Sequence, residues 1–136
     1  MEIGDRAGEA LDYGNLGTVF QSLSNYDKAQ EYHKIALAIR MEIGDRVGEA
    51  ADYGNLWTMS RSLGNYNQAQ EYHEKALAIR MEIGDRAGEA VDYGNQGTVF
   101  QSLGKYNMAR EYYKKAWPSE WKLVTEEEKQ QITDAL

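Results

Sequence analysis

A forty-residue internal repeat constrains this chain more than any other feature of its sequence. Residues 1–23 recur as residues 81–103 with two differences, Leu11 against Val91 and Leu16 against Gln96, and a middle copy follows in the same frame from Met41. Such self-similarity is typical of repeat arrays, in which neighbouring units bury each other's apolar faces. We therefore expect one domain over residues 1–136, with repeats at about 5–44, 45–84 and 85–117.

Each copy divides into two helical segments. Residues 5–23 place apolar or small side chains at spacings of three and four, the pattern of a helix with one buried face. Residues 26–43 carry a matching stripe, and the short turn between the two segments makes them pack antiparallel. The first stripe comprises Ala10, Tyr13, Leu16, Gly17, Phe20 and Leu23, and the second comprises Tyr26, Ala29, Tyr32, His33, Ala36, Ile39 and Ile43.

The predicted turns carry typical end-of-helix residues. Gly44 suits the end of a helix because glycine readily adopts the left-handed conformation, and Asp45 suits the cap of the next helix because its carboxylate accepts from free amide groups. Gly64, Gly104 and, in the first copy, Ser24 mark the turns inside the copies. The opening MEI resembles the end of a second helix, so we expect the chain to be a segment of a longer array.

The third copy ends differently from the first two. Pro118 cannot continue a helix comfortably, so the second helix should stop near Trp117, about two turns early. Thr125 and Glu128 form a capping-box pattern that predicts a last helix toward Leu136. We expect residues 118–136 to cap the array, with a flexible tail as the alternative. The side chains expected to pack this cap down are Trp117, Trp121, Leu123 and Val124.

Composition and charge disfavour several classes of function. The formal charge is −7 and no basic run is present, which disfavours nucleic acid and anionic membrane surfaces as partners. The sequence has no cysteine for disulfides or thiolate metal sites. It also shows no signal peptide and no stretch of about 18 apolar residues that would span a membrane. We expect a cytoplasmic protein.

The order of small and aromatic residues resembles the tetratricopeptide repeat family. Residues 13–37, YGNLGTVFQSLSNYDKAQEYHKIAL, show the pattern, and the other two copies match it. The resemblance implies an all-α, right-handed α-solenoid of three helix-turn-helix repeats with a C-terminal capping helix. The forty-residue period is longer than the usual unit of about 34. In that respect the array resembles those of the Pins and LGN spindle-orientation adaptors and of kinesin light chains.

Two departures from the repeat pattern affect the predicted core. Trp57 and Ser60 stand where the other copies have glycine and phenylalanine, which we interpret as a size exchange that keeps the packed volume constant. The alternative is that Trp57 is an exposed ligand anchor. Gln96 replaces a core leucine, so it should lie near the end of the array or find a hydrogen-bonding partner.

No pattern of residues indicates catalysis or a metal site. His33 and His73 occupy the same slot in adjacent copies, too far apart to share one ion, and are interpreted as rings packed within the array. The recurring carboxylates follow from duplication, and no glycine-rich phosphate loop follows a strand. We therefore expect no enzymatic activity, no cofactor and no bound metal.

A polar stripe recurs along the first helix of each copy. The resemblance implies that this helix lines the inner groove of the array, where asparagine can hold the backbone of an extended peptide. The alternative is that the asparagines tie neighbouring helices together. The polar stripe comprises Asn15, Asn55, Asn95, Thr18, Thr58, Thr98, Gln21, Arg61 and Gln101.

The predicted function is a non-catalytic scaffold that binds a peptide segment of a partner protein in this groove. The acidity of the chain favours a neutral or basic ligand, and the scarcity of cations in the polar stripe disfavours a clamp for a terminal carboxylate. The alternative is a self-associating module that forms a homo-oligomer through exposed repeat ends. A purely structural spacer is a third possibility.

Overall fold

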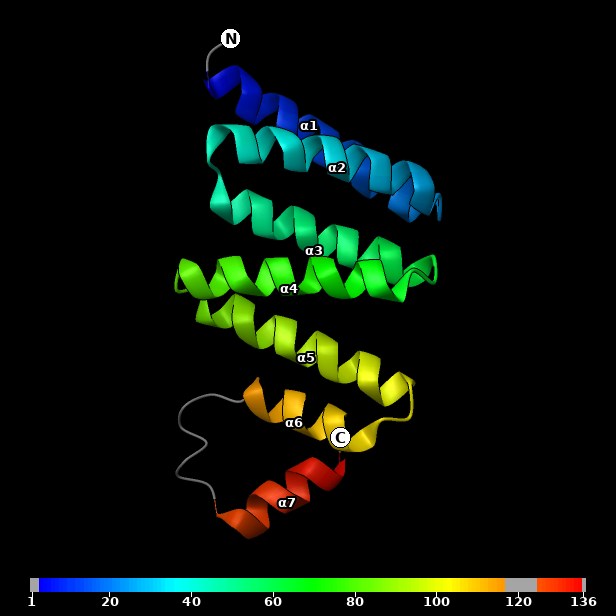
Figure 1. Ribbon diagram of the computed structural model, residues 1–136, viewed down its shortest axis with the longest axis vertical. Coiled ribbons are helices and arrows are strands. Elements are labelled where there is room, and N and C mark those ends of the chain that lie inside the picture. The colour runs from blue at the N-terminus through cyan, green and yellow to red at the C-terminus, as the bar shows by residue number, and fades with distance from the viewer. Residues whose placement is uncertain (1–2, 117–124, 136) are drawn as a thin grey trace. The chain divides into compact units, whose positions relative to one another are not determined.

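The computed structural model describes residues 3–116 and 125–135 and divides into two compact units, Met1–Asp85 and Arg86–Leu136. In the first unit the helices are α1 (Ile3–Ser22), α2 (Tyr26–Ile43), α3 (Arg46–Ser62) and α4 (Tyr66–Glu82), and in the second they are α5 (Arg86–Ser102), α6 (Tyr106–Lys115) and α7 (Glu126–Ala135) (Figure 1). The described residues form no strand. The predicted all-α fold of paired helices with a last capping helix is confirmed; the single domain and its repeat boundaries stay predictions.

The turns form as the sequence predicts. Gly44 has φ of 74°, and its N–H donates to the carbonyls of Arg40 and Met41. The carboxylate of Asp45 accepts from the N–H of Gly48 at 3.0 Å and so caps α3. Ser24 takes the same left-handed conformation, with φ of 59°. Gly4 lies inside α1, although it occupies the place in the repeat that Gly44 has.

The core of the first unit lies between successive helices. α2 packs against both α1 and α3, and α3 packs against α4. Alanines at the contacts allow the helix axes to approach closely, since a methyl group takes little space between them. The fully buried positions include Ala29 and Ala36 of α2 and Leu56 and Met59 of α3.

Two polar contacts join α2 to α3. The Nε of Arg40 lies 3.4 Å from Oδ2 of Asp52, and the amide of Gln30 donates to the hydroxyl of Ser60 at 3.1 Å. Burial raises the pKa of Asp52 to about 6, and the charge of Arg40 opposes that rise. The two helices are therefore matched by charge as well as by shape.

The prediction that Leu16 and Leu23 are buried is wrong. Leu16 is 42% exposed and Leu23 is 68% exposed, whereas Leu56, at the place of Leu16 in the next repeat, is 0% exposed. The reason is that α2 covers this face of α3, while α1 packs mainly against α2 through a different face. Ala10 and Gly17 on that other face are buried, as predicted.

In the second unit α5 packs against α6, which is short. α6 has 10 residues, against 18 in α2, so the predicted early end of this helix is confirmed. The capping box of α7 is also present: the N–H of Thr125 donates to Glu128 at 3.2 Å, and the N–H of Glu128 donates to the Thr125 hydroxyl at 3.1 Å. The aromatic and apolar residues expected to pack the cap lie in 117–124, outside the described residues.

Candidate functional site

The nine residues of the polar stripe lie on three helices. Asn15, Thr18 and Gln21 lie on α1, Asn55, Thr58 and Arg61 lie on α3, and Asn95, Thr98 and Gln101 lie on α5. The first two triplets belong to one compact unit and the third belongs to the other. Within each triplet, spacings of three residues keep the side chains on neighbouring positions of one helix surface.

The three asparagines of the polar stripe keep their hydrogen-bonding capacity within the described part of the chain. Asn15 is exposed, and Asn55 and Asn95 are half-buried. Across the described part of the chain, none of these three side-chain amides makes a hydrogen bond. Each therefore has a carbonyl oxygen to accept and two N–H groups to donate. The alternative role was hydrogen bonding between neighbouring helices, and no hydrogen bond of these asparagines to another helix is found among the described residues.

The threonines are bonded to their own helices. In each repeat the threonine hydroxyl donates at 3.1 Å to a glycine carbonyl four residues earlier, from Thr18 to Gly14, from Thr58 to Gly54 and from Thr98 to Gly94. The hydroxyl proton is thus engaged, but the oxygen can still accept. These threonines would serve a ligand as acceptors.

Arg61 is held against a buried indole. Its guanidinium carbon lies 4.8 Å from the centre of the Trp57 ring, a cation–π distance. Trp57 is only 8% exposed and lies 6.0 Å from the ring of His73, so it belongs to the core and is not an exposed ligand anchor. In the second repeat the indole therefore fixes the position of the only cation in the polar stripe.

Tyr113 contacts the polar stripe, and the sequence reasoning missed this residue. Its hydroxyl donates to Oε1 of Gln101 at 2.8 Å and lies 3.1 Å from the hydroxyl of Thr98. A β-carbon on Gly97 would lie 2.9 Å from the Tyr113 ring, so glycine is needed there for the ring to cross. The available signal was the change from histidine in the first two repeats to tyrosine in the third.

The two histidines are core residues. His33 and His73 are buried, and burial lowers the pKa of both imidazoles, which keeps them neutral. The His33 ring fills the space above Gly17, where an added β-carbon would lie 2.7 Å from the ring. Among the described residues, neither nitrogen of this ring has a hydrogen-bonding partner. In the part of the chain that the structure describes, no three His, Asp or Glu side chains are grouped as a metal site.

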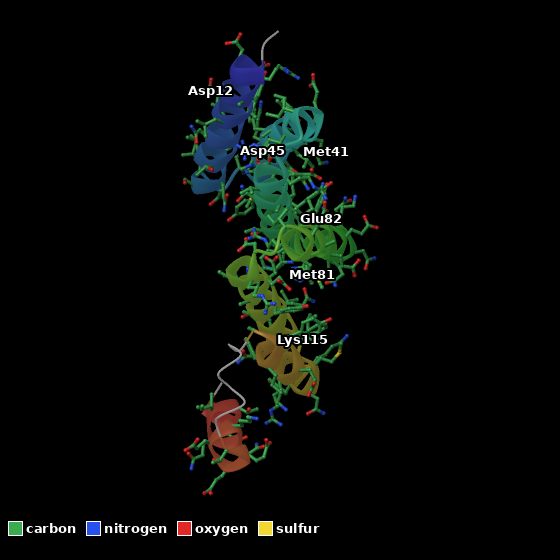
Figure 2. All side chains as sticks on the ribbon, turned by 90° about the vertical axis from the view of Figure 1, so that its left-hand side faces the viewer. Asp12, Met41, Asp45, Met81, Glu82 and Lys115 are labelled. Atoms are coloured by element: carbon green, nitrogen blue, oxygen red, sulfur yellow. The ribbon has the colours of Figure 1, made fainter. Side chains whose placement is uncertain are left out.

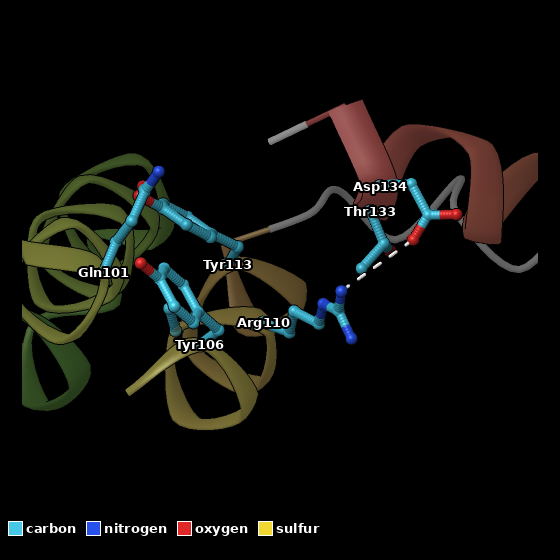
Figure 3. Close-up of a pocket in the computed structure, with 7 residues that line it drawn as sticks. Gln101, Tyr106, Arg110, Tyr113, Thr133 and Asp134 are labelled. Carbon is cyan, nitrogen blue, oxygen red and sulfur yellow. Dashed lines mark hydrogen bonds and ion pairs between the residues drawn. The ribbon is translucent and has the colours of Figure 1, made fainter. Parts of the chain in front are cut away.

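The second unit contains a small hollow among α5, α6 and α7. Its lining includes Gln101, Tyr106, Arg110 and Thr133, and its volume is about 110 Å³ (Figure 3). Nη2 of Arg110 lies 3.9 Å from Oδ1 of Asp134, so this contact links α6 to the capping helix. The hollow is smaller than the roughly 300 Å³ of common small-molecule sites, so it suits one side chain or a few waters.

Paired helices joined by tight turns, with polar residues repeated on the first helix of each pair, define a helical repeat protein of the α-solenoid class. Two family models, both described as tetratricopeptide repeat, match residues 13–47 and 58–117, which together are more than half of the chain. The chain therefore belongs to the tetratricopeptide repeat family. Such repeats generally mediate protein–protein interaction, and the family is typically non-catalytic.

The fold is similar to that in the crystal structure of BtubC (BKLC) from P. vanneervenii, with a TM-score of 0.72 and 22% identity. The alignment covers 88% of this chain and 48% of that one, so the chain spans about half the length of that structure. At this identity the likeness shows the fold alone. No curated protein matches the sequence.

No helix in the described residues is long and apolar enough to cross a membrane. The cytoplasmic location and the subfamily resemblance stay predictions.

Proposed function

We propose that this chain is a non-catalytic scaffold that binds an extended peptide segment of a partner protein along the polar stripe. The observation that carries the proposal is the set of three asparagine amides at one repeat position, none of which bonds elsewhere among the described residues. An amide that donates and accepts matches the pattern of a peptide backbone, so Asn15, Asn55 and Asn95 would hold main chain.

The surroundings of the asparagines favour a ligand with varied side chains. A β-carbon on Gly54 or Gly94 would meet no atom within 4 Å, and one on Gly14 would meet only the Arg40 guanidinium at 3.8 Å. There is thus room beside each amide. The net charge of −7 favours a neutral or basic peptide, and Arg61 is the only cation in the polar stripe.

The perturbed titratable groups support a role without catalysis. Asp52, His33 and His73 have shifted pKa values, and all three are buried among packed side chains. Their shifts therefore reflect the core, where a substrate has no access.

A peptide-display selection followed by one substitution tests the proposal. Asn55→Ala should weaken the selected peptide about tenfold, the loss of one good hydrogen bond, with no change in the thermal midpoint. Asn67→Ala, the same change at an exposed position of α4, is the matched control and should leave binding unchanged. Unfolding of Asn55→Ala without a separate binding defect, or a selection that yields no peptide, would contradict the proposal.

The second candidate is self-association through an exposed repeat end. The observation that favours it is the exposure of Leu16 on α1 and of Leu23 directly after α1. Light scattering across a concentration series separates the two candidates. A molar mass that stays at that of one chain at every concentration would exclude an oligomer. Growth of the mass with concentration would favour the second candidate.

A further inference from the structure

Arg61 differs from the other arginines of the first unit in its contacts. Among the described residues it makes no ion pair and no hydrogen bond, and its contact is the stacking on Trp57. Glu82, which Figure 2 labels, is one of the carboxylates that the other arginines bind. The ion pairs of these arginines join Arg6 to Glu9 and Glu42, Arg40 to Asp52, Arg46 to Glu49 and Glu82, and Arg80 to Asp85.

The repeat changes its sequence around Arg61. The first and third copies share Gly, Val, Phe and Gln at four positions where the second copy has Trp57, Met59, Ser60 and Arg61. Trp57 lies one helical turn before Arg61, and its indole is 8% exposed, so the guanidinium rests on a fixed surface. Stacking uses the face of the guanidinium and leaves the five N–H donors in its plane available. Arg61 is therefore a positioned cation whose donors are not used within the described residues.

A carboxylate is the ligand that matches this group. The planar guanidinium binds a carboxylate through two parallel hydrogen bonds. The sequence around Arg61 supplies none, because no acidic residue lies between Asp52 and Glu71. Asn55 precedes Arg61 by six residues, roughly 9 Å along the helix. A peptide whose main chain is held by Asn55 would thus reach Arg61 with a side chain.

We propose that Arg61 binds the carboxylate of an aspartate or glutamate side chain in the partner's peptide and so selects its sequence. The inference rests on the proposed function, because it names one side chain of the peptide that the polar stripe holds. The other eight members of the polar stripe are uncharged, so one acidic residue is sufficient. The net charge of −7 favours neutral or basic residues around it.

Two other roles of Arg61 compete with this one. The polar stripe has members in the repeats before and after Arg61, so the peptide would continue past it, which favours a side chain over a terminal carboxylate. Arg61 also lies in the last turn of α3, where a positive charge stabilises the helix dipole. That role needs only the charge, whereas recognition of a carboxylate needs the planar guanidinium.

The probe is a library of random linear peptides, displayed and selected in parallel on the whole chain and on its Arg61→Gln variant. This variant restores the residue of the other two repeats. We expect an acidic residue at one peptide position with the unaltered chain only. In fluorescence anisotropy, changing that residue to its amide should weaken a selected peptide about tenfold on the unaltered chain and not at all on Arg61→Gln. Arg61→Lys should keep only part of the affinity.

A control variant separates a local contact from the general effect of charge. Lys34→Gln, at an exposed position of α2, removes the same charge and should leave the affinity unchanged. Equal losses with Lys34→Gln and Arg61→Gln would overturn the proposal. So would an affinity that Arg61→Lys retains in full, since charge alone would then be sufficient. Circular dichroism melts of each variant measure its effect on the fold.

The remaining outcomes distinguish this inference from the proposed function. Selected peptides that Asn55→Ala weakens and Arg61→Gln does not would overturn the inference and leave the proposed function standing. A selection that yields no peptide would overturn both. Binding that is lost when the C-terminus of the peptide is amidated, but not when its side chain is, would make a terminal carboxylate the ligand. A lower thermal midpoint of Arg61→Gln with unchanged affinity would assign Arg61 to the helix dipole.

Discussion

Replacing Gln96 by leucine should stabilise the chain. Gln96 is 2% exposed, and its Oε1 has no hydrogen-bonding partner in the described part of the chain, so the partner that the sequence analysis allowed for is not found there. The first two repeats have leucine at this position, and Leu56 is buried without a polar atom to satisfy. Gln96→Leu thus removes an unpaired acceptor and restores the side chain of the other repeats.

The size of the effect follows from the burial. A buried acceptor without a bond costs about 1–3 kcal/mol, and glutamine and leucine are close enough in volume that the exchange leaves little cavity or overlap. We expect Gln96→Leu to raise the free energy of unfolding by about 1–2 kcal/mol. For a chain of this length each kcal/mol shifts the thermal midpoint by roughly 3–5 °C.

Urea denaturation followed by circular dichroism at several protein concentrations measures this change. The reciprocal variant Leu56→Gln should lose at least as much as Gln96→Leu gains, whereas Leu16→Gln should change little because Leu16 is exposed. The reasoning is refuted if Gln96→Leu leaves the midpoint unchanged or lowers it at constant m-value.

Four further substitutions test other features of the structure. His33→Tyr should raise stability by about 1 kcal/mol, because the hydroxyl would find the partners that its counterpart has in the third repeat. The lowered pKa of His33 means that the unfolded chain binds the proton first, so stability falls as the pH drops below about 6.5, and this variant should show a smaller fall in acid titrations. Arg40→Gln should lower the free energy of unfolding by about 3 kcal/mol near pH 7, because it leaves the buried carboxylate of Asp52 unpaired. The loss should be smaller at pH 5, where the Asp52 carboxyl is neutral. An equal loss at both pH values would argue against the ion pair. Gly44→Ala should lower the free energy of unfolding by about 1 kcal/mol, because φ is 74° at this position. Gly4→Ala lies inside α1 and should raise the free energy of unfolding by up to about 1 kcal/mol. Thermal melts of this matched pair measure both changes.

Local chemistry explains why most of the helical architecture could be predicted. The left-handed turn at Gly44, the cap at Asp45 and the capping box of Thr125 and Glu128 each depend on residues within a few positions of one another. The spacing of apolar residues likewise reflects the helix itself. These features are readable because their interactions are short in sequence.

Of the candidate site, the sequence could name the helices and the polar types but not the state of each group. The repeat pattern leaves open the directions of the side chains. These directions decide that the asparagines make no bond within the described residues, that the threonine protons are engaged, and that Arg61 stacks on Trp57. Tyr113 was missed for the same reason, because its partners Thr98 and Gln101 lie on the preceding helix.

By itself, the sequence determined that this protein is an array of paired helices, because helix periodicity and turn chemistry are local and recur every forty residues. Only the tertiary structure decided what each copy of the repeat does. Leu16 and Leu56 are the same residue in the same local pattern, yet one is exposed and the other is fully buried. The physical reason is that the burial of a residue depends on the neighbouring helix as well as on the residue itself. α2 covers this face of α3, whereas among the described helices of the unit no helix covers the same face of α1.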